Sequence, residues 1–193
     1  MEKLYAIVSD FDDTLFFNKP ALISAAKDMY QTLLKRKEKD DKTLNDLEIT
    51  IGEGRVPKGF DKKWKNELYT LAYVKYRSEL SPNLPFINYL KESVKQGNEL
   101  IVLSARGEEF REQTEELLDK YGLDYSRIIL PVNHELKDEE WKLLEIKKLS
   151  EKYNHLVLFE DKEENIHYII NNLKPENVEF YLVDHSVITY IAH

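Results

Sequence analysis

The chain has 193 residues, of which 42% are hydrophobic and 33% are charged, so it can bury a core and keep a well-solvated surface. Its formal net charge of −8 disfavours non-specific nucleic-acid binding, which depends on the neutralisation of phosphates by Lys and Arg. It contains no cysteine, which excludes disulfides and thiolate chemistry, and no signal peptide or membrane span is predicted. We expect a cytoplasmic protein with no membrane partner.

A short apolar run at residues 5–8 predicts a strand that is buried on both faces. The run stops at three carboxylates, Asp10, Asp12 and Asp13, and the hydroxyl of Thr14 follows them. A buried parallel strand carries the next residues to the carboxyl edge of a sheet, where α/β proteins build their sites. Like charges ~4 Å apart repel by about 4 kcal/mol at an effective dielectric of ~20, which favours a bound divalent cation. The alternative is that these residues only cap a turn or a helix.

The residues after this acidic loop are mostly helical. Apolar side chains at helical spacing predict one helix that begins near Pro20 and another around Trp64. A charged stretch at 35–42 and a glycine-rich stretch at 50–60 are expected to be connections. We expect residues 17–83 to form a small helical cap subdomain, inserted after the first strand.

The rest of the chain alternates between helices and strands. Strands are predicted at 99–103, 127–132, 155–159 and 178–183, and helices at about 86–97, 108–121, 138–153 and 163–173. Such alternation indicates βαβ units with right-handed crossovers. We therefore expect an α/β fold, with a Rossmann-like parallel sheet and helices on both faces, built from residues 1–16 and 84–193.

Further polar residues follow the predicted strands at the same edge of the sheet. Ser104 comes directly after one strand, and Glu160 and Asp161 come after another. Lys142 lies in the first turn of a predicted helix. Carboxylates, a hydroxyl and a lysine at the tips of a parallel sheet suit phosphoryl transfer through a phospho-aspartate. One carboxylate attacks phosphorus, a cation bridges it and the phosphate, and a second carboxylate exchanges the proton.

At this point the chain resembles the haloacid dehalogenase superfamily of phosphohydrolases. The four motifs of that superfamily appear in order as Asp10-Phe11-Asp12-Asp13-Thr14-Leu15, a strand that ends in Ser104, Lys142, and Glu160-Asp161. The resemblance covers the α/β core, about 1–15 and 85–185, and says little about the inserted helices. It implies a haloacid dehalogenase-like core. We expect the inserted helices to act as a cap that closes over the site and selects the substrate, as lids do in general.

The resemblance also implies a role for each residue of the first motif. Asp10 is expected to be the nucleophile and a direct Mg²⁺ ligand. Asp12 is expected to protonate the leaving oxygen, then to activate the water that hydrolyses the aspartyl-phosphate, and to lend its backbone carbonyl to the metal. Thr14 is expected to stabilise the loop. An acid/base residue at the position of Asp12 favours a phosphatase over an ATPase.

The other motifs complete the expected site. Ser104 is expected to hydrogen-bond a phosphoryl oxygen, and Lys142 to hold the phosphate, with Lys137 as the alternative lysine. Asp161, with Glu160, is expected to complete the magnesium site, and Asp161 is the favoured direct ligand of the two.

Three basic residues have open assignments. Arg106 either clamps the phosphate or pairs with Glu108 or Glu109. Arg55 and Lys58, in the glycine-rich stretch, either contact an anionic substrate or belong to a plain connection between two helices.

The expected function is that of a Mg²⁺-dependent phosphatase, with no organic cofactor. Its expected partner is a small phosphorylated metabolite, of the nucleoside monophosphate or sugar phosphate class, and it cleaves this phosphomonoester through an aspartyl-phosphate. Two alternatives stay open: a phosphoryl transferase or mutase on the same scaffold, and a non-catalytic phosphate-binding regulatory module.

Overall fold

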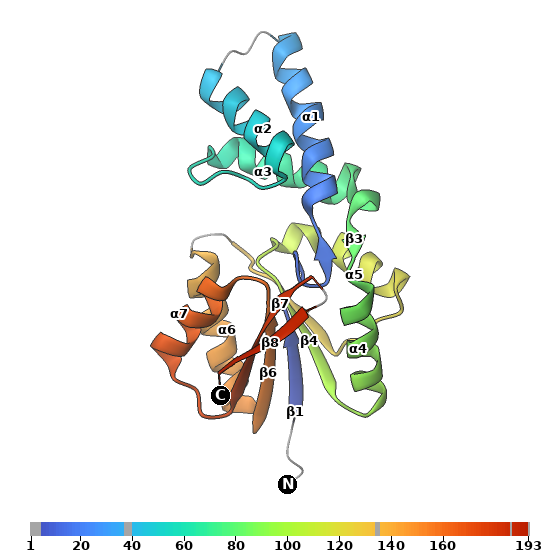
Figure 1. Cartoon of the computed structure of the whole chain (residues 1–193), viewed down its shortest axis with the longest axis vertical. Helices are drawn as coiled ribbons and strands as arrows, with labels where there is room; N and C mark the ends of the chain where they lie inside the picture. The colour runs from blue at the N-terminus through green and yellow to red at the C-terminus, as the bar shows by residue number, and fades with distance from the viewer. Residues whose placement is uncertain (1–4, 37–39, 134–135, 186, 193) are drawn as a thin grey trace. The chain divides into compact units, whose positions relative to one another are not determined.

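The computed structural model describes residues 5–36, 40–133, 136–185 and 187–192. The chain divides into two compact units (Figure 1). The first, here called the α/β unit, comprises Met1–Phe16 and Pro82–His193, and the second, the helical unit, comprises Phe17–Ser81. The chain crosses between them at two short paired strands, β2 (Phe16–Phe17) and β3 (Ser81–Pro82).

The described residues of the α/β unit form a six-stranded sheet with the order β5-β4-β1-β6-β7-β8. Its strands are β1 (Tyr5–Ser9), β4 (Glu99–Leu103), β5 (Arg127–Ile129), β6 (His155–Glu160), β7 (Val178–Asp184) and β8 (Val187–Ala192). All neighbouring pairs up to β7 are parallel, and only β8 runs antiparallel to its neighbour. The predicted α/β fold is confirmed, with an antiparallel edge strand that the sequence pattern did not indicate.

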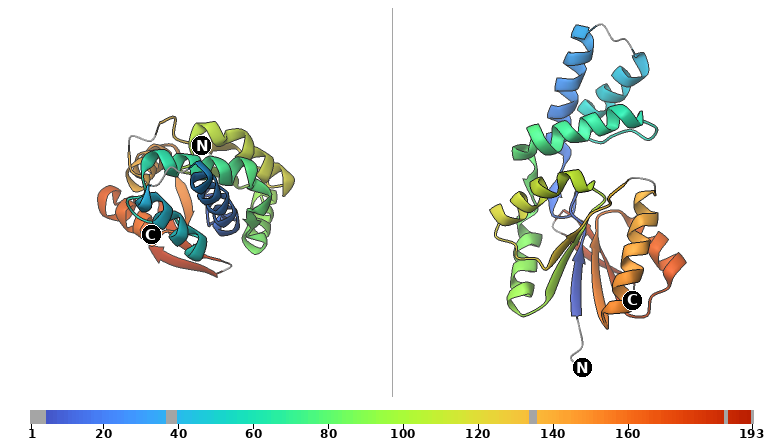
Figure 2. Two further views of the ribbon diagram at one scale, coloured as in Figure 1. Left: turned by 90° about the horizontal axis from the view of Figure 1, so that it is seen from above. Right: turned by 180° about the vertical axis from the view of Figure 1, so that it is seen from behind.

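Helices lie on both sides of this sheet (Figures 1 and 2). One side carries α4 (Leu84–Lys95) and α5 (Arg111–Lys120), which a 3₁₀ turn at Glu108–Phe110 precedes. The other side carries α6 (Asp138–Lys152) and α7 (Glu163–Leu173).

The apolar side chains of strand β1 are buried on both faces of the sheet. Ala6 and Val8 belong to a buried cluster with Ile146 of α6 and Ile166 of α7. Side chains alternate along a strand, so Ile7, which is also buried, faces the opposite side. A strand buried on both faces holds the residue that follows it in a fixed place, and this residue is Asp10.

The helical unit consists of α1 (Lys19–Arg36), α2 (Asp41–Glu53), α3 (Lys62–Thr70), a π-helical turn at Leu71–Lys75 and a 3₁₀ turn at Arg77–Glu79. Helix α1 packs against α2 and α3, and the buried side chains include Ala25, Met29, Leu47 and Leu68. In the described part of the chain, no helix combines the length and apolar character needed to cross a membrane. The role of these helices as a cap stays a prediction.

The two connections predicted at 35–42 and 50–60 are partly wrong. Residues 37–39 lie outside the described residues, and α2 begins within the first predicted connection, capped by the Asp40 side chain. The same helix continues into the second predicted connection and ends at Gly54, whose φ of +71° is the left-handed conformation typical of a helix end. Helix α2 was not predicted because polar residues interrupt the apolar spacing by which a helix is recognised in a sequence.

Candidate active site

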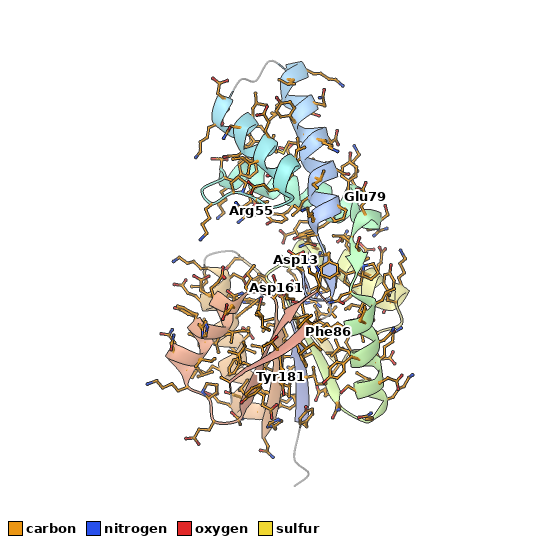
Figure 3. All side chains as sticks on the ribbon, viewed as in Figure 1. Asp13, Arg55, Glu79, Phe86, Asp161 and Tyr181 are labelled. Carbon is orange, nitrogen blue, oxygen red and sulfur yellow. The ribbon has the colours of Figure 1, made fainter. Side chains whose placement is uncertain are left out.

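The candidate site lies where the carboxyl ends of β1 and β6 meet. These strands are neighbours, and the backbone N–H of Asp10 donates to the carbonyl oxygen of Phe159 at 2.9 Å. The strand that follows β1 in the sheet, β4, lies on one side of this pair, and the strand that follows β6, β7, lies on the other. The connections from β1 and β6 therefore diverge here, which is where parallel α/β sheets place their ligands. Glu160 ends β6 and Asp161 follows it. Figure 3 shows Asp161 and Asp13 at this end of the sheet.

Three carboxylates gather at this edge of the sheet. One oxygen from each of Asp10, Glu160 and Asp161 lies within 4.8 Å of the other two. Burial raises the pKa of Asp10, and Glu160 raises it further against the opposing effect of Lys142, to about 7. Burial and the neighbouring Asp10 and Glu160 raise the pKa of Asp161 to about 10. Charge is unfavourable here without a counter-ion, and buried carboxylate oxygens are the donors that a hard divalent cation prefers. The residues present therefore fit such an ion.

Lys142 supplies a fixed positive charge beside this cluster. Its ammonium lies 2.8 Å from an oxygen of Asp10 and 2.7 Å from an oxygen of Glu160, with Asp138 at 3.6 Å. Burial lowers the pKa of Lys142, but the surrounding carboxylates more than offset this, so the pKa lies well above its usual range. The side chain of Lys137 is 74% exposed and lies beside Glu139. The structure therefore places Lys142, rather than Lys137, beside the carboxylate cluster.

The loop after β1 turns tightly and returns a hydroxyl to the cluster. Asp13 has a φ of 62°, and its backbone N–H donates to the carbonyl oxygen of Phe16 at 2.8 Å. The hydroxyl of Thr14 lies 3.4 Å from an oxygen of Asp10 and 3.5 Å from an oxygen of Asp161. Thr14 thus contacts the acidic cluster itself, in addition to being part of the loop.

Ser104 lies at the end of β4, the other neighbour of β1. It is fully buried, and its backbone N–H donates to the carbonyl oxygen of Ile129 at 3.1 Å. Its hydroxyl oxygen accepts a hydrogen bond from the backbone N–H of Arg106 at 3.3 Å. This contact shapes the turn after β4, and the predicted contact of Ser104 with a phosphoryl oxygen stays a prediction.

Arg106 pairs with Asp12, a partner that the sequence did not indicate. Its Nε lies 2.9 Å from both carboxylate oxygens of Asp12, and its Nη2 lies 2.6 Å from Oδ1. Glu108, which the sequence offers as a partner of Arg106, instead accepts a hydrogen bond from Arg111 at 2.8 Å. This ion pair joins the loops that follow β1 and β4. The two residues are far apart in the sequence and come together because β1 and β4 are neighbouring strands.

Comparison with known proteins identifies the fold. No family model and no curated protein matches the sequence. Among solved structures, a chain from a complex of Pnkp1, Rnl and Hen1 is 22% identical, with a TM-score of 0.58 over 95% of this chain and 47% of that chain. A chain from a structure described as the Pnkp1/Rnl/Hen1 RNA repair complex is 20% identical, with a TM-score of 0.57 over 95% of this chain and 43% of that one. This protein thus spans less than half the length of either.

A third solved structure decides the assignment. The protein described as a HAD hydrolase of family IA, variant 3, from Entamoeba histolytica is 19% identical, with a TM-score of 0.58 over 91% of this chain and 82% of that one. The chain has the haloacid dehalogenase fold. The resemblance that the four motifs indicate is thereby confirmed at the level of the fold.

Within the haloacid dehalogenase fold, a further ion pair connects the start of α6 to the loop after β6. Asp138 accepts a hydrogen bond from the ammonium of Lys162 at 3.0 Å. Burial raises the pKa of Asp138, but Lys142 and Lys162 lower it by more, so it lies below its usual value. Sequence reasoning missed this pair, and the lysine directly after Asp161 was its only signal.

The haloacid dehalogenase core thus brings together most of the residues that the motifs single out. Asp10, Glu160, Asp161 and Lys142 form one buried cluster with the hydroxyl of Thr14. Asp12 and Ser104 both contact Arg106. The chemical role of each residue stays a prediction.

Proposed function

We propose that this protein is a Mg²⁺-dependent phosphatase that hydrolyses small phosphomonoesters, of the nucleoside monophosphate or sugar phosphate class, through an aspartyl-phosphate on Asp10. One observation carries the proposal: the buried Asp10 carboxylate has the Lys142 ammonium at 2.8 Å and lies in a cluster of three carboxylates. A carboxylate nucleophile beside a fixed cation and a divalent-ion site is what phosphoryl transfer needs. The haloacid dehalogenase fold, shared with a protein described as a hydrolase, supports it.

The proposed metal ligands are Asp10, Asp161 and the backbone carbonyl of Asp12, with Glu160 beside them. Glu160 is engaged through both oxygens, one with the Lys142 ammonium at 2.7 Å and the other with the backbone N–H of Lys162 at 3.2 Å. Asp161 is therefore the better candidate for direct contact, and Glu160 orients the lysine. When bound, Mg²⁺ neutralises the phosphate and the crowded carboxylates.

The residues of the chain then divide the chemistry into two displacements. In the first, an oxygen of Asp10 bonds to phosphorus, the ester P–O bond breaks, and Asp12 gives its proton to the departing alkoxide. In the second, water bonds to phosphorus, Asp12 takes the proton from this water, and the bond from phosphorus to Asp10 breaks to release inorganic phosphate. Lys142 and Ser104 hold phosphoryl oxygens through both steps.

Two other functions use the same residues. A transferase or mutase replaces water by a substrate hydroxyl in the second displacement, and a regulatory module binds phosphate without turnover. The similarity to a chain of an RNA repair complex favours one further substrate class, phosphorylated RNA. The net charge of −8 opposes this class, because nucleic-acid affinity depends on basic side chains.

The test is hydrolysis of p-nitrophenyl phosphate with and without Mg²⁺. We expect Mg²⁺-dependent turnover in the wild type, none with Asp10→Asn, and a loss of about 10²- to 10⁴-fold with Asp12→Asn. Asp13→Asn is the matched control, since Asp13 is exposed and asparagine accepts its positive φ. Equal activity in all samples would refute the assignment.

Two further measurements separate the alternatives. A panel of sugar phosphates, nucleoside monophosphates and oligonucleotides with a 3′- or 5′-phosphate identifies the substrate class. Release of inorganic phosphate, set against transfer to an added alcohol, distinguishes the phosphatase from the transferase. Phosphate binding without any turnover would indicate the regulatory module.

A further inference from the structure

We propose that Arg106 is a positioning residue that holds the carboxylate of Asp12 in the orientation needed for its two proton transfers. The inference rests on the proposed function and adds a residue to it. Its basis is geometric: the guanidinium contacts both oxygens of Asp12, at 2.9 Å from Nε and 2.6 Å from Nη2. Contacts of this forked kind fix the direction of a carboxylate as well as binding it.

Arg106 is itself held in place. Its side chain is fully buried, and its guanidinium carbon lies 4.3 Å from the centre of the Phe11 ring. Phe11 stacks in turn on Phe16, with ring centres 4.9 Å apart. The backbone N–H of Arg106 donates to the hydroxyl oxygen of Ser104 at 3.3 Å. The donor that fixes Asp12 therefore has little freedom of its own.

Asp12 has the opposite character, because it reaches toward solvent. Its side chain is 23% exposed and follows the buried Asp10 by two residues. A partly exposed acid/base residue has several side-chain orientations open to it, and a misplacement of 1 Å can cost about 10²-fold in rate. The contact with Arg106 settles this orientation before substrate arrives, so its effect is expected in catalysis rather than in substrate binding.

A phosphate clamp is the rival reading of the same residue, and the two make different predictions. A clamp binds the phosphate directly, so its loss weakens every phosphate ligand whether Asp12 is present or not. A positioning residue acts only through Asp12. Its loss lowers kcat/KM most for esters with a poor leaving group, whose departure needs the proton, and least for p-nitrophenyl phosphate, whose departure does not. The later activation of water needs Asp12 with either ester, but kcat/KM does not report on that step.

The test compares Arg106→Lys with the wild type on p-nitrophenyl phosphate and β-glycerophosphate. Lysine keeps the positive charge but cannot make the two-pronged contact of a guanidinium with both carboxylate oxygens. We expect kcat/KM for β-glycerophosphate to fall at least about tenfold more than for p-nitrophenyl phosphate. We expect inhibition by inorganic phosphate to stay within about twofold of the wild type, since the contact with Arg106 adds no uniform binding. Added guanidinium ion should partly restore the activity of Arg106→Ala.

The control is Arg111→Lys, which removes a similar two-pronged contact between Arg111 and Glu108. It should leave kcat/KM unchanged for both esters. A double-mutant cycle is decisive, because Arg106→Lys should add no more than about twofold once Asp12→Asn is present. Equal losses on both esters, weaker phosphate inhibition, or a full additional loss in the Asp12→Asn background would overturn the proposal in favour of a clamp.

A crystal structure of Arg106→Lys provides a reading that does not depend on turnover. We expect the Asp12 carboxylate to move from its wild-type position. An unmoved carboxylate would overturn the positioning role even in an active enzyme. If the wild type hydrolysed neither ester although Asp12 moved in Arg106→Lys, the proposed function would be refuted instead. Failure of the positioning role and failure of the proposed function are therefore distinguishable.

Discussion

The acidic cluster predicts that one conservative substitution stabilises the metal-free protein while it abolishes the metal response. The change is Asp161→Asn, which keeps the size of the side chain and removes its charge. Asp161 lies with Asp10 and Glu160 in a group whose oxygens are within 4.8 Å of one another, and its pKa is raised to about 10 by burial and by these two carboxylates. The substitution removes the carboxyl group that bears this shift and leaves its surroundings in place.

The size of the effect follows from the spacing. An ionised Asp161 would meet a repulsion of about 3.5 kcal/mol from one charged neighbour 4.8 Å away at an effective dielectric of ~20. Near neutral pH the folded protein avoids this repulsion by holding a proton on Asp161, which also costs stability. Lys142 offsets part of this repulsion, so we expect Asp161→Asn to raise the free energy of unfolding by about 2 kcal/mol, or the melting temperature by roughly 4 to 8 °C for a chain of this size.

The pH dependence has a definite sign. The pKa of Asp161 is about 10 in the folded state against an ordinary value of 3.8, so the folded protein holds a proton that the unfolded chain releases. The stability of the metal-free wild type therefore falls as pH rises from about 4 towards 10, and Asp161→Asn flattens this fall.

The assay is thermal unfolding in EDTA and in excess Mg²⁺, across this pH range, with Asp124→Asn at an exposed position as the control. Mg²⁺ should raise the melting temperature of the wild type and of the control, but not of Asp161→Asn, because a ligand stabilises only the state that binds it. If Asp161→Asn melted below the wild type in EDTA, or gained as much from Mg²⁺, the reasoning would be refuted.

Two other predictions concern the same cluster of charged side chains. Lys142→Met leaves Asp10 and Glu160 buried without their cation, so in metal-free buffer urea unfolding should show a loss of about 3 to 5 kcal/mol, whereas Lys137→Met should be silent; equal effects would contradict the geometry. Mg²⁺ affinity, measured by calorimetry, should weaken as pH falls from 8 to 6, because the ion needs ionised carboxylates and the pKa of Asp10 is about 7; a pH-independent affinity would exclude Asp10 as a ligand.

The core of the fold could be predicted because its local signals agree. The apolar run before Asp10 and the alternation of helices and strands lead to the same parallel sheet, which the structure confirms. Strand β8 escaped prediction because its first four residues are exposed and no glycine marks the turn before it. The φ of +54° at His185 makes that turn instead. Helix α2 escaped because its apolar residues are diluted by polar ones.

The candidate site, too, could be predicted from the sequence only in part. Residues that follow strands, such as Asp10 and Asp161, could be placed at one edge by the rule for parallel sheets, and the structure brings them together. The contact of Arg106 with Asp12 could not be foreseen, because 94 residues separate the two and only the register of β1 against β4 aligns them. Local pattern identifies which side chains reach the edge of the sheet but not which of them touch.

The central place of β1 also governs the order in which this protein can assemble. Its partner strands arrive late in synthesis, since β4 begins at Glu99 and β6 at His155. A ribosome-bound fragment that stops before β6 therefore carries Asp10, Asp12 and Asp13 but neither Glu160 nor Asp161, so it lacks two of the three carboxylates of the buried cluster. We expect binding of the proposed ion to follow completion of the sheet. Contacts that span so much sequence make this a slow-folding topology.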